Sequence, residues 1–387
     1  MQIFRNSAIL YVLLSSPLLA SKGEADALSL GGLQNNETPS RSIFSKDRFD
    51  IALSYSALVQ GALGEGESGG SGEAAFSGRY VFVDETYPSR LLNKLGVESD
   101  GSLSLKFRFR QRHKLLDISA AELALPIGSI LGTTDGFSNS GFEIPDFYIQ
   151  HVFHQGKVEL RYGQITVESR IDGHALRSAK TAFLNRVFST NPTVAFPRFG
   201  AGATTRWQVN DHFSLTGVLT QVQASKAGTQ VDFDLNASDL FTGLQFDYEW
   251  GDEEKLSNSL QLLFWGADAT DELKEDFGFS ATFEQHYTGL DRSIFARIAS
   301  SQGQQTDLDM MGVVGIGQTM REKDLIGIGT GVGHSSEKGR TQAVLEAFYR
   351  YQAPFGLQIT PDVQLLIGDG LDGDFDFVAG LRGHIYF

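Results

Sequence analysis

The sequence predicts an all-β protein: an antiparallel transmembrane β-barrel of 16 strands, with long extracellular loops and one loop folded into the pore. In its last stretch, Leu381, Ile385 and Phe387 alternate with Arg382 and His384. A period of two marks a strand with one apolar and one polar face. The alternation recurs along the chain, and Gly (43 residues) and Phe (29) outnumber Pro (9), which suits turns and aromatic girdles. A chain filled with such strands is typical of a barrel that is apolar outside and polar inside.

The N-terminal residues predict a secretory signal peptide over 1–27, followed by one barrel domain over 28–387. Arg5 precedes an apolar core at 9–19, and small residues lie before a cleavage point at Ala27; Ala20 is an alternative. No later run approaches ~20 apolar residues, the length of a membrane helix. A membrane location therefore requires a closed barrel, which satisfies its backbone hydrogen bonds internally. We expect a multi-pass β-barrel in the outer membrane of a Gram-negative-type bacterium.

Sixteen segments alternate in this way. They span 48–60, 74–86, 101–114, 145–154, 156–166, 200–209, 212–222, 239–250, 256–267, 275–286, 291–300, 309–319, 325–333, 341–352, 357–367 and 374–387. Short turns at 154–157, 210–211, 321–324 and 354–356 fall on alternate connections, and longer loops at 61–73, 115–144, 167–199 and 223–238 fall between them. Short turns on one side and long loops on the other are the outer-membrane pattern.

A soluble secreted β-sandwich or propeller would also alternate. The apolar faces argue against it, because they keep large residues without interruption, as in Leu244, Phe246 and Tyr248 or in Phe277 and Phe279. The net charge of −15 argues against general nucleic-acid binding.

The third segment predicts a row of cations inside the barrel. Lys106, Arg108, Arg110 and Arg112, named here the basic ladder, alternate with Leu and Phe. A Lys or Arg facing lipid at the bilayer midplane costs ~2–4 kcal/mol, so the ladder should face the lumen. The alternative is that these cations only neutralise carboxylates and solvate the wall.

Other polar positions predict a mixed lumen. Candidate pore-lining residues on the strands are Glu159, Arg161, Glu346, Arg350, Asp362 and Gln364. Arg170 and Asp172 lie in the 167–199 loop, which we expect to fold inward and to carry a short helix over 173–188. Charged and amide groups suit hydroxyl-rich solutes, because a hydroxyl both donates and accepts. The alternatives are pairs that satisfy one another across adjacent strands and an ordinary extracellular loop.

Several stretches resemble the carbohydrate-selective porins of the OprB type. They are Gly156–Gln164, Phe188–Pro192, Glu346–Tyr351, Ile359–Gln364 and Phe377–Phe387. The resemblance covers most of the chain after about residue 145. It implies a sixteen-stranded outer-membrane channel that lets monosaccharides and related sugars diffuse, with a constriction mixing arginines and acidic groups. It also implies that Arg108, Arg110, Glu159, Arg161, Glu346 and Arg350 are reasonable lumen residues.

The function expected is passive diffusion of small sugars through a water-filled lumen. Alternatives are a general or anion-leaning porin based on the basic ladder, a plugged structural barrel, and an outer-membrane enzyme. We expect no enzyme, because no Ser-His-acid spacing stands out and no His-Glu-x-x-His metal motif occurs. No cofactor or metal is expected, although the acidic segment 369–376 leaves calcium open. Expected partners are sugars, outer-membrane lipid and lipopolysaccharide, and the assembly machinery that reads the terminal Phe387; the barrel would be a monomer or a trimer.

Overall fold

The computed structural model describes residues 42–46, 48–64, 66–83, 101–223, 228–235, 239–252, 255–321 and 323–387. The predicted signal peptide, 1–27, lies outside these residues. In the described part of the chain, no helix has the length and apolar character needed to cross a membrane.

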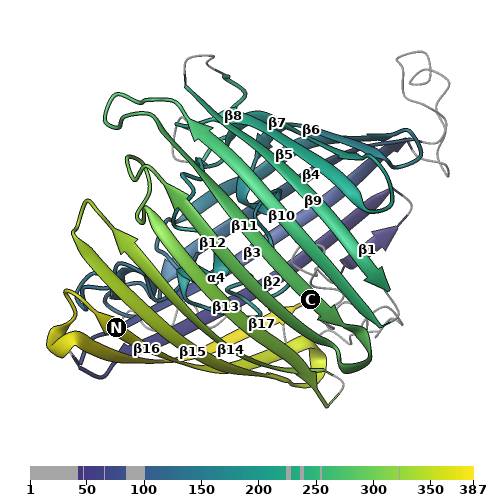
Figure 1. The fold of residues 1–387 in the computed structure, drawn as a ribbon. Coiled ribbons are helices and arrows are strands. Elements are labelled where there is room, and N and C mark those ends of the chain that lie inside the picture. Colours follow the sequence, from purple (N-terminus) through teal and green to yellow (C-terminus); the bar gives the residue numbers. More distant parts are fainter. Residues whose placement is uncertain are drawn as a thin grey trace.

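Sixteen antiparallel strands, β2 to β17, form a closed ring (Figure 1). Each strand pairs with the next along the chain, and β17 closes the ring by pairing with β2. The strands are β2 (Phe49–Ala62), β3 (Ser68–Val83), β4 (Ser102–Lys114), β5 (Phe142–Phe153), β6 (Val158–Ile165), β7 (Gly200–Gln208), β8 (Phe213–Gln221), β9 (Leu240–Asp252), β10 (Leu256–Ala267), β11 (Asp276–Tyr287), β12 (Arg292–Ser301), β13 (Met310–Met320), β14 (Asp324–Ser335), β15 (Arg340–Gln352), β16 (Leu357–Gly368) and β17 (Phe375–Tyr386). The predicted strand number is confirmed.

One further strand, β1 (Ser42–Lys46), was not expected from the sequence. It pairs with residues 49–52 of β2, whereas β17 pairs with β2 only from Ser54 onward. The Phe387 amide donates to the Leu53 carbonyl at 3.0 Å, at the point where β17 ends. β1 therefore pairs with the first residues of β2, which extend past the end of β17.

The two faces of each strand separate as the period of two predicts. Phe277, Phe279 and Leu381 point outward and are exposed, whereas Arg382 and His384 point inward and are buried. Exposed apolar side chains in an unbroken outer band are what a lipid-facing surface requires.

The glycine-rich stretch predicted as a long loop over 61–73 is mostly strand. β2 runs to Ala62 and β3 begins at Ser68, so only 63–67 connect them. Close packing explains why this strand is rich in glycine. A Cβ on Gly69 would lie 2.5 Å from the Ser119 carbonyl oxygen, and one on Gly72 would lie 2.5 Å from the Tyr55 hydroxyl. Glycine serves here to let neighbours approach the strand. The run 66–70 matches Gly-x-Ser-x-Gly, but Ser68 opens a strand and no helix follows, so it is not a nucleophile elbow.

Two long loops fold into the barrel, residues 115–141 and 166–199, and α4 (Arg186–Ser189) lies within the ring (Figure 1). Phe183 and Phe188 of the second loop pack in one apolar cluster with Phe295 and Phe348 of the wall. This confirms the predicted inward fold of the 167–199 loop, whereas the inward fold of the 115–141 loop was not predicted.

The helix predicted over 173–188 is wrong; only α4 and the 3₁₀ turn η4 (Val167–Ser169) are helical in this loop. Asn185 caps α4 by accepting from the Val187 amide at 3.2 Å. Between η4 and α4, some backbone groups form hydrogen bonds with side chains of the wall and not with one another as in a helix. The Leu184 amide, for example, donates to the Glu346 carboxylate. Tertiary contacts thus replace the helical hydrogen bonds.

Candidate functional site

Two cavities lie end to end inside the barrel. The long-loop cavity, about 890 Å³, is lined by both inward-folded loops and by β3 and β4. The short-turn cavity, about 410 Å³, is lined mainly by β2 to β6 near the end with the short turns. Arg108, Ser169 and Lys180, named here the junction residues, line both cavities. The junction is therefore where the two cavities meet.

The basic ladder faces the lumen, as predicted, and its arginines are each paired with a carboxylate. Arg108 bonds Asp146 at 2.9 Å, Arg110 bonds Glu143 at 2.7 Å and Arg112 bonds Glu73 at 2.6 Å. Lys106 lines the short-turn cavity. The structure thus combines both interpretations, because the ladder lines the cavities and also neutralises lumen carboxylates.

The junction brings a loop cation against the ladder wall. The Lys180 amine contacts Glu73, and Arg108 donates to the Thr166 hydroxyl at 3.2 Å. Burial lowers the pKa of the Lys180 amine, and the negative charge of Glu73 opposes that shift. The side chains of Arg108 and Lys180 keep 31% and 23% of their surface exposed. Charged groups that stay accessible to solvent at the junction can hydrogen-bond a passing solute.

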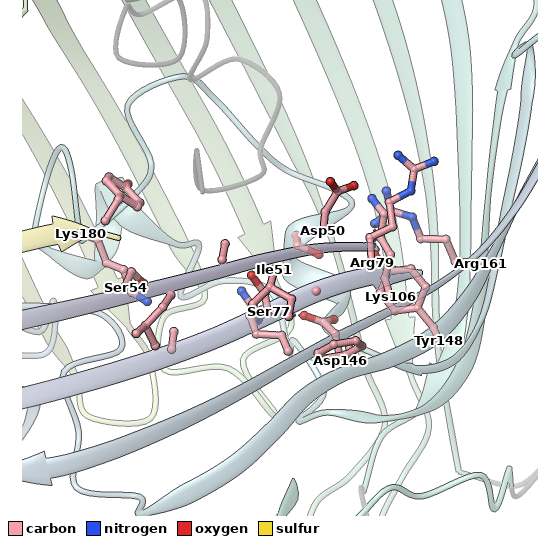
Figure 2. A pocket seen from close by; sticks show the side chains of 18 residues that line it. Asp50, Ile51, Ser54, Ser77, Arg79, Lys106, Asp146, Tyr148, Arg161 and Lys180 are labelled. Carbon is pink, nitrogen blue, oxygen red and sulfur yellow. Dashed lines mark hydrogen bonds and ion pairs between the residues drawn. The ribbon is translucent and has the colours of Figure 1, made fainter. Parts of the chain in front are cut away.

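Glu159, Arg161 and Arg170 form one ion-pair group. Glu159 accepts from Arg161 at 2.9 Å and from Arg170 at 2.6 Å, and Arg161 also donates to the Tyr148 hydroxyl at 2.9 Å. Arg170 belongs to the inward loop, so the group ties the start of that loop to β6. Of these three residues, Arg161 lines the short-turn cavity (Figure 2).

Five predicted pore-lining residues are buried where the inward loops meet the wall, away from both cavities. They are Asp172, Glu346, Arg350, Asp362 and Gln364, all at most 3% exposed. Glu346 accepts from the amides of Leu184 and Asn185 at 2.6 and 2.9 Å, and Arg350 donates to the Thr181 carbonyl at 3.0 Å.

The remaining three are held in the same way. Gln364 donates to the Thr133 carbonyl at 2.8 Å, and Asp362 accepts from Gln364 at 3.2 Å. Asp172 accepts from the Ser280 hydroxyl at 2.6 Å. All five side chains are buried between the loops and the wall, so they hold the loops in place and line neither cavity.

Other residues of the site were not selected from the sequence. Glu73 was assigned to a loop, Glu143 lay just before the predicted start of its strand, and Ser169 and Lys180 lie on an irregular loop. A signal existed for Glu73, because Ser71, Glu73 and Ser77 alternate with glycine, alanine and phenylalanine. For Ser169 and Lys180 the sequence offers no periodic signal. Among the described residues, no three His, Asp or Glu side chains are grouped closely enough to hold a metal ion.

Comparison with known proteins agrees with the fold. Residues 260–387 match the model of the carbohydrate-selective porin, OprB family. No curated protein matches the chain.

Solved structures have the same barrel. The high-pH structure of Pseudomonas putida OprB has a TM-score of 0.71 at 14% identity, covering 88% of this chain and 94% of that one. Its low-pH structure has a TM-score of 0.57 at 14% identity, covering 88% and 93%. A mutant of the Rh. blastica porin has a TM-score of 0.53 at 10% identity, covering 88% and 100%. At these identities the solved structures establish the fold.

The C-terminal third therefore carries the family's sequence pattern, and the described chain forms a closed barrel with the fold of the solved OprB structure. The likeness to the carbohydrate-selective porins of the OprB family thus rests on sequence over residues 260–387 and on the barrel fold over the rest of the described chain.

Proposed function

We propose that sugars cross this barrel by moving from the long-loop cavity past Arg108, Ser169 and Lys180 into the short-turn cavity. The observation that carries the proposal is that these three residues line both cavities. No covalent chemistry is involved: polar groups replace part of the solute's hydration, and a concentration gradient drives passage.

The chemistry of the junction supports hydroxyl-rich solutes. Arg108 and Lys180 supply donors, Asp146 and Glu73 supply acceptors, and the Ser169 hydroxyl supplies both. Because the cations are already paired with carboxylates, a neutral sugar meets no uncompensated charge there. Because the donors and acceptors of the junction are already paired with one another, a sugar binds there weakly enough to be released.

The surroundings of the channel are proposed from its surface. Lipid and lipopolysaccharide would contact the outward apolar band, which exposes Phe264, Ile298 and Leu381. The assembly machinery would read the terminal Phe387 during insertion. One chain lines both cavities, so permeation would need no second copy, in a monomer or in a trimer.

The test is a liposome-swelling assay with the refolded protein and a variant that narrows the junction. Ser169→Trp places a large ring where the cavities meet. We expect the wild-type protein to pass glucose faster than a size-matched zwitterion, to exclude larger oligosaccharides, and to lose most of its glucose permeability in the variant.

The matched control is Ser336→Trp, at an exposed turn residue that lines neither cavity. Glucose should enter at the wild-type rate in this control. Equal rates for Ser169→Trp and the wild type would mean that the solute passes elsewhere, and equal entry of all small solutes would point to a general porin.

A further inference from the structure

The short-turn cavity has a charge opposite to that of the whole protein. Its lining includes five cations, Arg79, Lys106, Arg108, Arg161 and Lys180, and two carboxylates, Asp50 and Asp146. The chain as a whole carries a net charge of −15. A cleft lined by one sign of charge between low-dielectric walls concentrates solutes of the opposite sign.

The cations differ in how far they are neutralised. Arg108 is paired with Asp146 at 2.9 Å, and Lys180 contacts Glu73. Arg161 is paired with Glu159 and also stacks over the Tyr148 ring, 5.1 Å from its centroid. In contrast, Arg79 forms no salt bridge with any described residue, and its Nε, like the Arg108 Nε, is buried and donates no hydrogen bond there. An Arg nitrogen in that state points to a missing acceptor, because buried donors are nearly always paired.

Arg79 and Lys106 are adjacent. They are direct partners in the β3–β4 register, and both side chains extend from the same face of the sheet. Figure 2 shows Arg79, Lys106 and Arg161 gathered on one side of the cavity, with Asp50 beside them and Lys180 apart from them. A guanidinium and an ammonium side by side match the charge and donor pattern of a carboxylate.

The rest of the lining suits hydroxyl groups. Ser54, Ser77 and the Tyr148 hydroxyl face the same cavity, together with the carboxylates of Asp50 and Asp146. A ligand that satisfies the whole lining has one carboxylate and several hydroxyls. A simple inorganic anion would use the cations and leave the hydroxyl-binding side empty.

We propose that the short-turn cavity is a binding site for sugar acids of the hexuronate type, with the carboxylate against Arg79 and Lys106 and the hydroxyls toward Asp50 and Tyr148. The inference rests on the proposed function, since it places the ligand on the same sugar path. The site lies past the junction, so a sugar acid that enters from the long-loop side binds there before release. Neutral sugars still pass, but acidic sugars stay longer.

The test uses the refolded full-length protein in planar bilayers carrying a potassium chloride current. Glucuronate, glucose and acetate are added in turn, and the half-blocking concentration of each is measured. We expect glucuronate to block at a lower concentration than glucose, which lacks the carboxylate, and at a lower concentration than acetate, which lacks the hydroxyls. In Arg79→Gln the half-blocking concentration of glucuronate should rise about tenfold, the loss expected for one charge-assisted hydrogen bond.

The matched control is Arg340→Gln, because Arg340 lies at the long-loop rim of β15 and lines neither cavity. Its glucuronate block should equal that of the wild type. Lys106→Gln provides a second variant on the other side of the proposed carboxylate, with an increase in the same direction as Arg79→Gln.

Three results would overturn the site. They are equal block by glucuronate and acetate, equal block by glucuronate and glucose, or an unchanged glucuronate block in both Arg79→Gln and Lys106→Gln. Swelling with glucose separates this failure from failure of the proposed function. If glucose enters and glucuronate blocks no better than acetate, the sugar path stands and the sugar-acid site does not.

Discussion

The inner face of this barrel has two walls that share a composition and differ in role. On the open wall, β2 to β6, charged side chains such as Arg108 and Lys106 line the two cavities. On the covered wall, β11 to β17, charged side chains such as Arg297 and Glu346 are buried under the inward loops. The open wall pairs cations with carboxylates, whereas the covered wall pairs many of its charges with the loop backbone. Whether a loop covers a wall therefore decides whether a charged residue lines a cavity or holds the loop.

The covered wall holds the 166–199 loop with complementary charges. Glu284 and Glu346 accept from loop amides, and Arg297, Arg350 and Arg382 donate to loop carbonyls. A buried charge is tolerated when it is hydrogen-bonded. Loop amides and loop carbonyls that have no partner in regular secondary structure therefore find one on the wall. These hydrogen bonds let an irregular loop stay inside the barrel.

The largest effect should come from removing an acceptor on the covered wall. Glu346→Ala leaves the Leu184 and Asn185 amides without their acceptor, and each buried unpaired group costs ~1–3 kcal/mol. The loop should loosen, so single-channel conductance and the size cut-off for oligosaccharides in liposome swelling should both rise. Glu249→Ala, at an exposed position of β9, is the control and should behave as the wild type. Unchanged conductance in Glu346→Ala would show that this contact does not hold the loop.

Removing a donor from the same wall should have a comparable but smaller effect. Arg297 donates to the Thr190 and Asp172 carbonyls at 2.7 and 2.8 Å, and Arg297→Met leaves both without that donor. The variant also leaves the buried Asp172 carboxylate, 3.5 Å from Arg297, without its cation. We therefore expect a loss of about 3 kcal/mol in the free energy of unfolding. Thermal unfolding in detergent measures it. The control is Arg292→Met, at a half-buried position on the outward face of the same strand, which should lower the thermal unfolding midpoint much less. Equal shifts in the two variants would mean that the bonds from Arg297 to the loop do not stabilise the protein.

At the junction, where the inward loop meets the open wall, a substitution of Lys180 should change ion selectivity. Lys180→Gln removes a cation from the junction while keeping a polar side chain of similar length. One charge at close range in water is worth about 1 kcal/mol, so the anion-to-cation permeability ratio should fall by up to roughly fivefold. The reversal potential in a salt gradient measures this ratio, and the effect should shrink at high salt. The control is Lys114→Gln, at an exposed position at the end of β4, which should leave the permeability ratio unchanged. A similar fall of the ratio in this control would mean that charges at the mouth of the barrel set the selectivity.

The sequence predicts the walls much better than it predicts what covers them. Alternation is a local property, so the strand number, the lumen-facing ladder and the outward rows at Phe277 and Leu381 could be predicted from neighbouring residues alone. The register that pairs Arg112 with Glu73 depends on strand ends hidden in a glycine-rich stretch. That stretch reads as a loop because glycine is common in turns, whereas here it admits Ser119 and Tyr55 close to the strand.

The covered residues illustrate the limit more sharply. Glu346 and Arg350 have the same alternating context as Arg108 and Arg110, and only the distant loop distinguishes them. That loop is fixed by contacts such as Leu184 to Glu346, which are 162 residues apart in sequence. No local pattern encodes such contacts, so the predicted site mixed passage residues with loop-holding residues.

The smallest effect concerns a carboxyl group on the other inward loop, and it depends on pH. Burial, together with the negative charge of Glu168, raises the pKa of Asp135 to about 6 from its ordinary value of 3.8. Asp135 lines the long-loop cavity, so that cavity gains one negative charge as the pH rises from 5 to 7. Cation preference, measured by reversal potential, should therefore increase modestly over this range, and Asp135→Asn should abolish the increase.

The same group should affect stability with a defined sign. The folded protein holds the Asp135 proton more tightly than the unfolded chain does, so its contribution is fully present below pH 3.8 and is lost as the pH rises through about 6. Asp135→Asn should remove this part of the pH dependence of thermal unfolding. Asp117→Asn, at an exposed position of the same loop, is the control and should keep it. If the asparagine variant at 135 keeps the wild-type profile in both measurements, the titrating group lies elsewhere. If only the selectivity profile changes, the Asp135 carboxyl affects ion preference in the long-loop cavity but does not account for the pH dependence of unfolding.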